Sequence, residues 1–134
     1  MKILIVEDDY SNQMVLQSIL AQYGKVVIAG DGKLAIKKVL FESGGFDALF
    51  IDIGLPYING NDLISMIRKW EQEQKKTPHI IVVTSGRGSK KDILDSFKSG
   101  CNFYLTKPFL LSEVEGFMKE AGFAIQASYA TEKS

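Results

Sequence analysis

Acidic side chains stand directly after two apolar stretches of this sequence, and they are its first candidates for chemistry. Residues 3 to 6 (ILIV) are followed at once by Glu7 and Asp8. Residues 48 to 51 (ALFI) are followed by Asp52. Carboxylates that gather in one place repel and raise each other's pKa unless a cation lies among them. Carboxylate oxygens with neither His nor Cys nearby favour Mg²⁺, which also binds phosphate groups.

A hydroxyl group and an ammonium group follow two further apolar stretches. Thr84 comes directly after residues 80 to 83 (IIVV), and Lys107 comes just after the weaker run 102 to 105 (NFYL). Taken alone, Thr84 could be an ordinary β-branched residue of a strand and Lys107 a surface lysine. The acids alone could belong to a solvent-exposed turn. If the stretches are parallel strands, however, all of these side chains lie at one sheet edge. Metal, ammonium, hydroxyl and a carboxylate nucleophile would then surround a phosphoryl group.

Five short apolar runs, with residues 26 to 29 (VVIA) as the second, alternate with stretches of helical pattern. The runs are continuous rather than alternating, which is typical of parallel strands covered on both faces. Helices are expected over residues 10–23, 32–42, 61–70, 89–98 and 112–121. This alternation predicts an α/β fold in which five helices and a five-stranded parallel sheet form a three-layer sandwich. The expected strand order is the flavodoxin-like order 2-1-3-4-5.

Local signals predict where these helices begin and end. Ser89 with Asp92, and Ser112 with Glu115, have the spacing of a capping box. Asp9 suits a helix N-cap better than a metal ligand. Glycines are expected to end three helices, at Gly24, Gly100 and Gly122. An apolar stripe at helical spacing is expected in the core, formed by Leu63, Met66, Ile67 and Trp70.

Length and composition restrict the class of protein. The 134 residues suit one domain, expected over 1–122 with a tail at 123–134. The chain is 46% hydrophobic, which excludes a disordered type. Its 16 basic and 16 acidic residues cancel, which argues against a nucleic-acid partner. With no membrane-spanning run, no signal peptide and the single cysteine Cys101, a cytoplasmic location is expected.

The chain resembles the receiver domain of bacterial two-component response regulators. The resemblance rests on four segments in order, ILIVEDD, FIDIGLP, VVTSG and YLTKPF, and covers residues 2 to about 121. It implies a phosphorylation-activated signalling switch rather than a turnover enzyme. Asp52 would accept a phosphoryl group from a histidine kinase or histidine phosphotransfer protein, in a step that the domain itself catalyses. The surface of residues 89–98, 102–105 and 112–121 would then change to control a partner or an attached output domain.

The resemblance also implies a set of metal ligands. Asp8 and Asp52 would bind Mg²⁺ (or Mn²⁺) directly, together with the backbone carbonyl of Gly54. Glu7 would act mostly through water.

The remaining roles that the resemblance implies concern the phosphoryl group. Thr84 would bond a phosphoryl oxygen, and Lys107 would pair with the phosphate and precede a cis peptide bond to Pro108. Tyr104 fits the aromatic switch residue, which turns inward when Thr84 moves. Gly86 stands at a position that often tunes phosphate lifetime, as Gly54 does, and Arg87 just beyond it is expected to contact phosphate or a partner.

Three other functions have less support. A phosphohydrolase of the haloacid dehalogenase class needs an acid two residues after its nucleophile, where this chain has Gly54. A binding-only pseudo-receiver would lack site residues that are all present here. A flavin carrier needs a hydroxyl- and glycine-rich loop after the first strand, where this chain has VEDDYSN. A phosphate-binding loop is also disfavoured, because the segment SGRGSKK lacks the GxxxxGK[ST] spacing. The sequence leaves open the kinase, the output, homodimer formation, and whether the chain stands alone or belongs to a longer protein.

Overall fold

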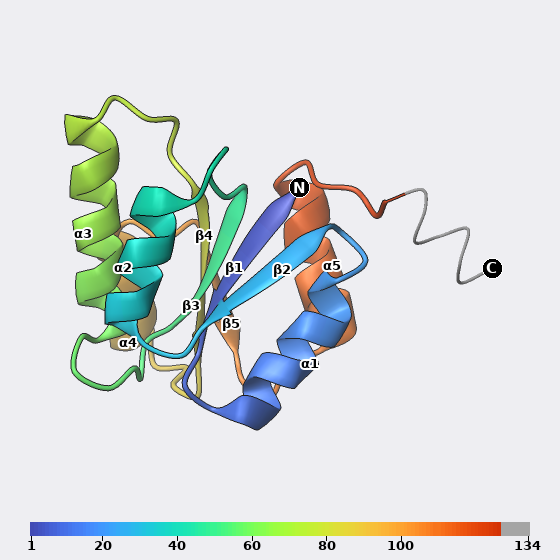
Figure 1. The fold of residues 1–134 in the computed structure, drawn as a ribbon. Helices are drawn as coiled ribbons and strands as arrows, with labels where there is room; N and C mark the ends of the chain where they lie inside the picture. Colours follow the sequence, from blue (N-terminus) through green and yellow to red (C-terminus); the bar gives the residue numbers. More distant parts are fainter. Residues whose placement is uncertain (127–134) are drawn as a thin grey trace.

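The predicted parallel sheet is present in the computed structural model, which describes residues 1–126. Its strand order is β2-β1-β3-β4-β5, and every neighbouring pair is parallel (Figure 1). The strands are β1 (Lys2–Val6), β2 (Lys25–Ala29), β3 (Ala48–Asp52), β4 (Ile80–Ser85) and β5 (Phe103–Thr106). The helices are α1 (Tyr10–Leu20), α2 (Gly32–Phe41), α3 (Gly60–Glu73), α4 (Lys90–Ser99) and α5 (Leu111–Glu120). Each helix follows one strand, so the predicted flavodoxin-like fold is confirmed.

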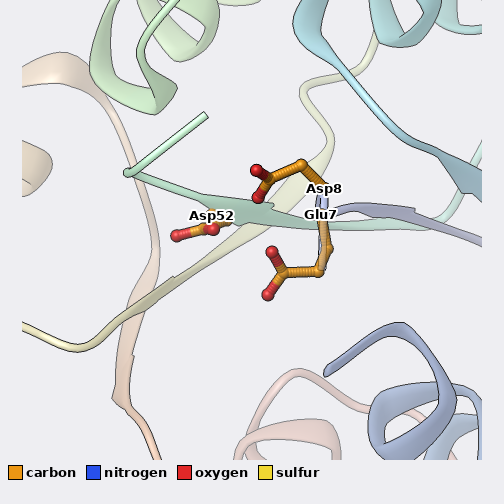
Figure 2. A group of neighbouring side chains, drawn as sticks. All are labelled: Glu7, Asp8 and Asp52. Atoms are coloured by element: carbon orange, nitrogen blue, oxygen red, sulfur yellow. The ribbon is translucent and has the colours of Figure 1, made fainter. Parts of the chain in front are cut away.

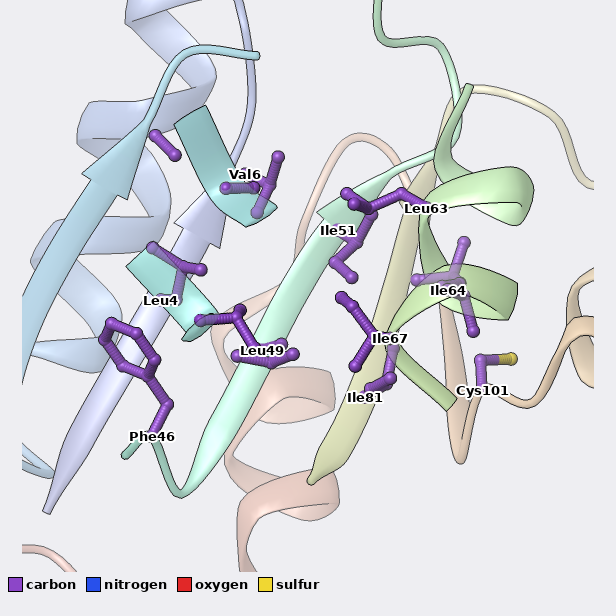
Figure 3. Close-up of a cluster of buried hydrophobic side chains, with 14 of the residues drawn as sticks. Leu4, Val6, Phe46, Leu49, Ile51, Leu63, Ile64, Ile67, Ile81 and Cys101 are labelled. Carbon is purple, nitrogen blue, oxygen red and sulfur yellow. The ribbon is translucent and has the colours of Figure 1, made fainter. Parts of the chain in front are cut away.

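The helices cover both faces of the sheet, which explains why the strands are apolar throughout. Alternate residues of a strand point to opposite faces. On one face Leu49 and Ile51 meet α2 and α3 in one buried cluster (Figure 3). On the other face Ile5 and Phe50 belong to a second cluster with residues of α1 and α5. α4 packs beside α3, on the same side as α2 (Figure 1).

The apolar stripe expected on α3 is buried only in part. Leu63 and Ile67 are buried, but Met66 is 47% exposed and Trp70 is only partly buried. The prediction of a core position is therefore wrong for Met66. The reason is that α3 packs on the sheet and on α2 with different sides, and Met66 lines an open groove between α2 and α3.

Several predicted helix ends are confirmed. The side chain of Asp9 accepts a hydrogen bond from Asn12 at the start of α1, and Ser89 accepts one from Asp92 at the start of α4. Gly100 caps the end of α4 in the left-handed conformation, with φ of 116°. Gly122 follows α5 with φ of 89°.

Two other predicted ends are wrong. α5 begins at Leu111, and its N-cap Leu110 makes no side-chain cap within the described residues, so Ser112 does not open the helix. α1 ends at Leu20, and Gly24 stands in the turn before β2. A Cβ atom at Gly24 would lie 2.3 Å from the carbonyl oxygen of Met1, so glycine here permits a close backbone approach.

Contacts continue beyond residue 122, where the domain was expected to end. Phe123 packs against the cluster between α1 and α5, and the amide of Gln126 donates to the carbonyl of Gln22 at 2.9 Å. The boundary itself stays a prediction, and residues 127–134 of the expected tail lie outside the described part. Within residues 1–126, no helix is both long and apolar enough to cross a bilayer.

Candidate functional site

The register of the sheet brings the predicted site residues to one edge. Asp52 is the last residue of β3 and lies directly beside Thr84 of β4. On the other side of β3, Ile51 pairs with Val6, the last residue of β1, so the acids that follow Val6 begin beside Asp52. The expectation of a shared carboxyl edge is confirmed.

Three carboxylates gather at this edge (Figure 2). Glu7, Asp8 and Asp52 each offer an oxygen, and these oxygens lie within 4.8 Å of one another. Glu7 and Asp52 are buried, whereas Asp8 is exposed. Such an all-oxygen donor set suits a hard divalent cation, which would offset the repulsion between the acids. The amide of Gly54 donates to Asp52 Oδ1 at 3.0 Å, while the role of its carbonyl as a further ligand stays a prediction.

Lys107 reaches into the same cluster from the loop after β5. Its Nζ lies 2.8 Å from Glu7 Oε1 and 3.2 Å from Asp52 Oδ2. The backbone holds this residue in place, because its amide donates to the carbonyl of Ser85 at 2.7 Å. The peptide bond from Lys107 to Pro108 is cis, as predicted.

The electrostatics of Glu7 and Lys107 follow from this arrangement. Burial, reinforced by the neighbouring Asp52, raises the pKa of Glu7 to about 7, although Lys107 acts against the shift. Burial by itself lowers the pKa of Lys107, but the hydrogen bond to Glu7 and the charges of Asp52 and Glu7 outweigh it and raise that pKa. Lys107 is therefore held as a cation between two acids. Sequence reasoning placed Lys107 near the site but missed its ion pair with Glu7.

Thr84 contributes a hydroxyl group with an unusual environment. The residue is 1% exposed, and its Oγ1 has no hydrogen-bond partner among residues 1–126. A buried hydroxyl without a partner costs about 1–3 kcal/mol. Because Thr84 lies beside Asp52, its hydroxyl is available to a ligand oxygen that binds at that carboxylate.

Gly60 is a supporting residue that the sequence reasoning missed. A Cβ atom at this position would lie 2.4 Å from the carbonyl oxygen of Asp52. Its amide donates to the carbonyl of Ile53 at 2.9 Å, which folds the loop back onto the end of β3. A glycine directly after the helix cap Asn59 is the signal that could have identified this close approach.

Tyr104 and Arg87 meet beside the site. The side chain of Tyr104 is partly buried, and its hydroxyl donates to the carbonyl oxygen of Arg87 at 2.5 Å. The expected switch residue therefore holds the loop that follows β4. Its inward turn stays a prediction.

Comparison with known proteins agrees with this geometry. The family model of the response regulator receiver domain matches residues 3–118. The chain is 30% identical over 107 residues to the sensor histidine kinase GacS of Pseudomonas protegens, covering 80% of this chain but only 12% of that kinase. The chain thus spans only a small part of the length of such a relative.

Two solved structures are similar over nearly their whole length. One is the receiver domain of the response regulator Ssk1 of Saccharomyces cerevisiae, crystallised with the histidine phosphotransfer protein Ypd1. It has a TM-score of 0.82 and 32% identity, over 91% of this chain and 88% of that one. The other is a CheY-like receiver domain protein of Methanospirillum hungatei, with a TM-score of 0.76 and 25% identity, over 89% of this chain and 90% of that one.

Proposed function

This chain belongs to the response regulator receiver domain family, and from that premise we propose that Asp52 is its phosphoryl acceptor in a two-component phosphorelay. The donor is a histidine kinase or a histidine phosphotransfer protein. Similarity to a receiver domain that was crystallised with such a phosphotransfer protein supports this choice of partner. A cytoplasmic location and the control of a downstream protein or output domain belong to the same proposal.

The observation that carries the proposal is the unpaired hydroxyl of Thr84. It is buried beside Asp52 and lacks a partner within the described residues. A phosphoryl group on Asp52 supplies acceptor oxygens to that hydroxyl. Phosphorylation therefore removes an unfavourable feature of the unmodified protein.

The neighbouring groups have proposed roles in this transfer. In the transfer, the phosphorus–nitrogen bond of the donor's phosphohistidine breaks as a phosphorus–oxygen bond forms to Asp52. The donor imidazole, protonated at its other nitrogen, leaves as a neutral ring. Lys107 already touches Asp52 and is placed to offset the charge of the phosphoryl oxygens.

Asp8 and Asp52, with the carbonyl of Gly54, are the proposed direct ligands of Mg²⁺ or Mn²⁺, and Glu7 acts mostly through water. A bound divalent cation supplies charge neutralisation to the carboxylates and to the phosphoryl oxygens. The mutual proximity of the three carboxylates supports this part of the proposal. Because Asp52 belongs to the proposed metal ligands, its phosphorylation is expected to depend on the metal.

The switch rests on Tyr104. When Thr84 bonds the phosphoryl group, Tyr104 turns inward and gives up its bond to the carbonyl of Arg87. The surface of α4, β5 and α5 changes with it. Phosphorylation must favour the changed state by several kcal/mol to act as a firm switch, about 5.5 kcal/mol for a shift from 1:99 to 99:1.

The first prediction concerns Asp52 itself. The protein is incubated with Mg²⁺ and acetyl phosphate and measured by intact mass spectrometry. Wild type is expected to gain one phosphoryl mass, because Asp52 is the carboxylate in contact with Lys107 and beside Thr84. Asp52→Asn is expected to gain none, and neither is wild type when EDTA replaces Mg²⁺.

Asp47→Asn is the matched control, since Asp47 lies at the opposite end of β3 and bonds only to Lys2 within the described residues. It should gain the phosphoryl mass as wild type does. If no adduct accumulates in wild type, tight binding of beryllofluoride would show that hydrolysis is fast. Absence of both the adduct and beryllofluoride binding would contradict the proposed function.

A further inference from the structure

A polar hollow of about 710 Å³ lies between α3 and α4, next to the proposed acceptor site. Gly54, two residues after Asp52, is one of the residues that line it, and charged side chains of α3, of α4 and of the loop before α4 line it as well. Glu7 and Lys107 are not among its lining residues.

Gly54 is the lining residue of this hollow that lies next to the acceptor carboxylate. A Cβ atom there would lie 3.7 Å from Asp52 Oδ1 and 4.0 Å from Oδ2. A larger side chain at this position would therefore crowd the carboxylate, whereas glycine leaves the space beside it open. In the loop after β4, a Cβ atom at Gly86 would meet no atom within 4 Å, so the space next to Gly86 is open as well.

Most charges in the hollow are already engaged. Lys91 pairs with Asp95 at 3.1 Å. Asp92 accepts a hydrogen bond from Ser89 at 2.6 Å, and Asp62 accepts one from Asn59 at 3.0 Å. The cations without an acidic partner among the described residues are Arg87 and Lys98.

Arg87 is the one of these two cations that belongs to the loop following Thr84. Its amide donates to Ser85 Oγ at 2.9 Å, and its carbonyl accepts from Tyr104, so its backbone is fixed on both sides. Lys98 lies farther out, about 10 Å along α4 from Lys91 at 1.5 Å per residue. A planar guanidinium is well suited to bind a carboxylate.

We propose that this hollow receives the leaving group of a small acyl phosphate donor, and that Arg87 binds the carboxylate that departs. This rests on the proposed function of Asp52. The oxygen–phosphorus bond of the acyl phosphate breaks as a phosphorus–oxygen bond to Asp52 forms. The acyl carboxylate leaves with one negative charge, and no proton is needed for the balance.

Two phosphodonors with different leaving groups test the inference. Acetyl phosphate releases acetate, an anion, whereas phosphoramidate releases neutral ammonia. Initial rates of adduct formation are measured with both donors by intact mass spectrometry at saturating Mg²⁺. Arg87→Ala is expected to slow the reaction with acetyl phosphate by up to about fivefold, the upper end of what an exposed ion pair contributes, and to leave the rate with phosphoramidate unchanged.

Two variants serve as controls. Arg87→Lys keeps the charge and should retain most of the acetyl phosphate rate. Lys98→Ala also removes one positive charge from the lining of the hollow, but at a position farther along α4, and it should leave both rates unchanged. Equal beryllofluoride binding by all variants would show that the acceptor site is intact.

Each other outcome has a distinct meaning. Equal slowing of both donors by Arg87→Ala, or no slowing of either, would overturn the role of Arg87. Equal slowing of acetyl phosphate by Lys98→Ala would also overturn it, because a general field would then explain the effect. If neither donor modifies wild type and beryllofluoride fails to bind, the proposed function of Asp52 fails first.

Discussion

Two side chains at the carboxyl edge occupy environments that are unfavourable without a ligand. Thr84 buries a hydroxyl that has no partner among the described residues. Glu7 is a buried acid beside Asp52, and burial raises its pKa to about 7. A bound phosphoryl group and cation would satisfy both. These residues therefore bias the protein toward the liganded state, since a ligand shifts an equilibrium only through differential interactions.

For Thr84 we predict effects of opposite sign in the free and the liganded protein. Thr84→Val replaces the unpaired hydroxyl by a methyl group of similar size. The free protein is expected to gain about 1 kcal/mol in free energy of unfolding, because a buried unsatisfied group is removed. The additional stability from Mg²⁺ and beryllofluoride is expected to fall. Urea unfolding with and without these ligands measures both.

Thr77→Val is the matched control for this prediction, since Thr77 is exposed and lies before β4, at the other edge of the sheet. It should change neither quantity. A loss of stability in ligand-free Thr84→Val would show that the hydroxyl has a partner in solution.

Asp8 gives a second prediction at the residue scale. Asp8→Asn removes one of three clustered charges, so the metal-free protein should become more stable. Wild type should gain about 2.7 kcal/mol at an Mg²⁺ concentration 100 times its Kd, and Asp8→Asn should lose most of that gain. Thermal unfolding across an Mg²⁺ titration distinguishes the two, with Asp9→Asn as control because Asp9 caps α1. An undiminished gain in Asp8→Asn would exclude Asp8 as a ligand.

At the scale of elements, a buried ionic network ties α3 to its neighbours at the opposite edge of the sheet. Arg68 Nη1 lies 2.8 Å from Glu71 Oε1, and Arg68 Nε donates to the carbonyl of Gly100 at 2.9 Å. Glu71 also accepts from His79, whose Nδ1 lies 2.6 Å from Glu71 Oε2. The network joins α3 to the start of β4 and to the end of α4. It thereby fixes the end of α4 that is farther from the acceptor site.

This network predicts a pH-dependent stability. Burial alone would raise the pKa of Glu71, but hydrogen bonds from Arg68 and His79 outweigh it and leave that pKa below 4.5. Because the folded pKa is the lower one, the stabilisation is present above pH 4.5 and is lost as pH falls through the folded value. Glu71→Gln should therefore lose about 1–3 kcal/mol at pH 7, and the difference should shrink below pH 4.5.

Urea unfolding of both proteins from pH 7 to acid values measures this difference. Glu73→Gln is the control on the same helix, since its pair with Lys69 spans 3.9 Å between exposed side chains. It should show no comparable loss. A difference between wild type and Glu71→Gln that is constant with pH would contradict the assigned charge.

The sequence predicted elements best where local chemistry determines them. Continuous apolar runs identified all five strands, and the caps Asp9 and Ser89 were recognised because each side chain bonds within its own turn. Ser112 misled the prediction because α5 begins with backbone contacts of Leu110 instead. Met66 was misplaced because an apolar residue on a helical stripe does not reveal how far the neighbouring helix extends.

The candidate site was predictable for a different reason. Parallel strands place their carboxyl ends together, so Asp52 and Thr84 could be assigned to one edge without side-chain detail. The ion pair between Lys107 and Glu7 depends on how the loops after β1 and β5 fold toward each other, and no local pattern records that. The network of Arg68 and Glu71 was missed for the same reason.

At the scale of the whole molecule, the end of the described chain takes part in the core. Phe123 packs with α1 and α5, and Gln126 bonds to the backbone of Gln22. Chains ending at residue 126 and at residue 122 should therefore differ by about 1 kcal/mol or more, since a fully buried Phe contributes about 1.5–3 kcal/mol. Urea unfolding of the two chains, with Phe123→Ala in the longer one, measures the difference. Equal stabilities would support a domain boundary at 122.

The contact between Lys107 and Glu7 joins residues that are 100 positions apart, and four strands (β2 to β5) and four helices (α1 to α4) lie between them in the chain. No fragment that ends before β5 can form it, so a chain still being synthesised has no complete acceptor site. Competence to receive a signal therefore appears only with the last strand. An incomplete molecule would lack the Lys107 ammonium beside Asp52, so beryllofluoride binding is expected to report only molecules whose last strand is in place.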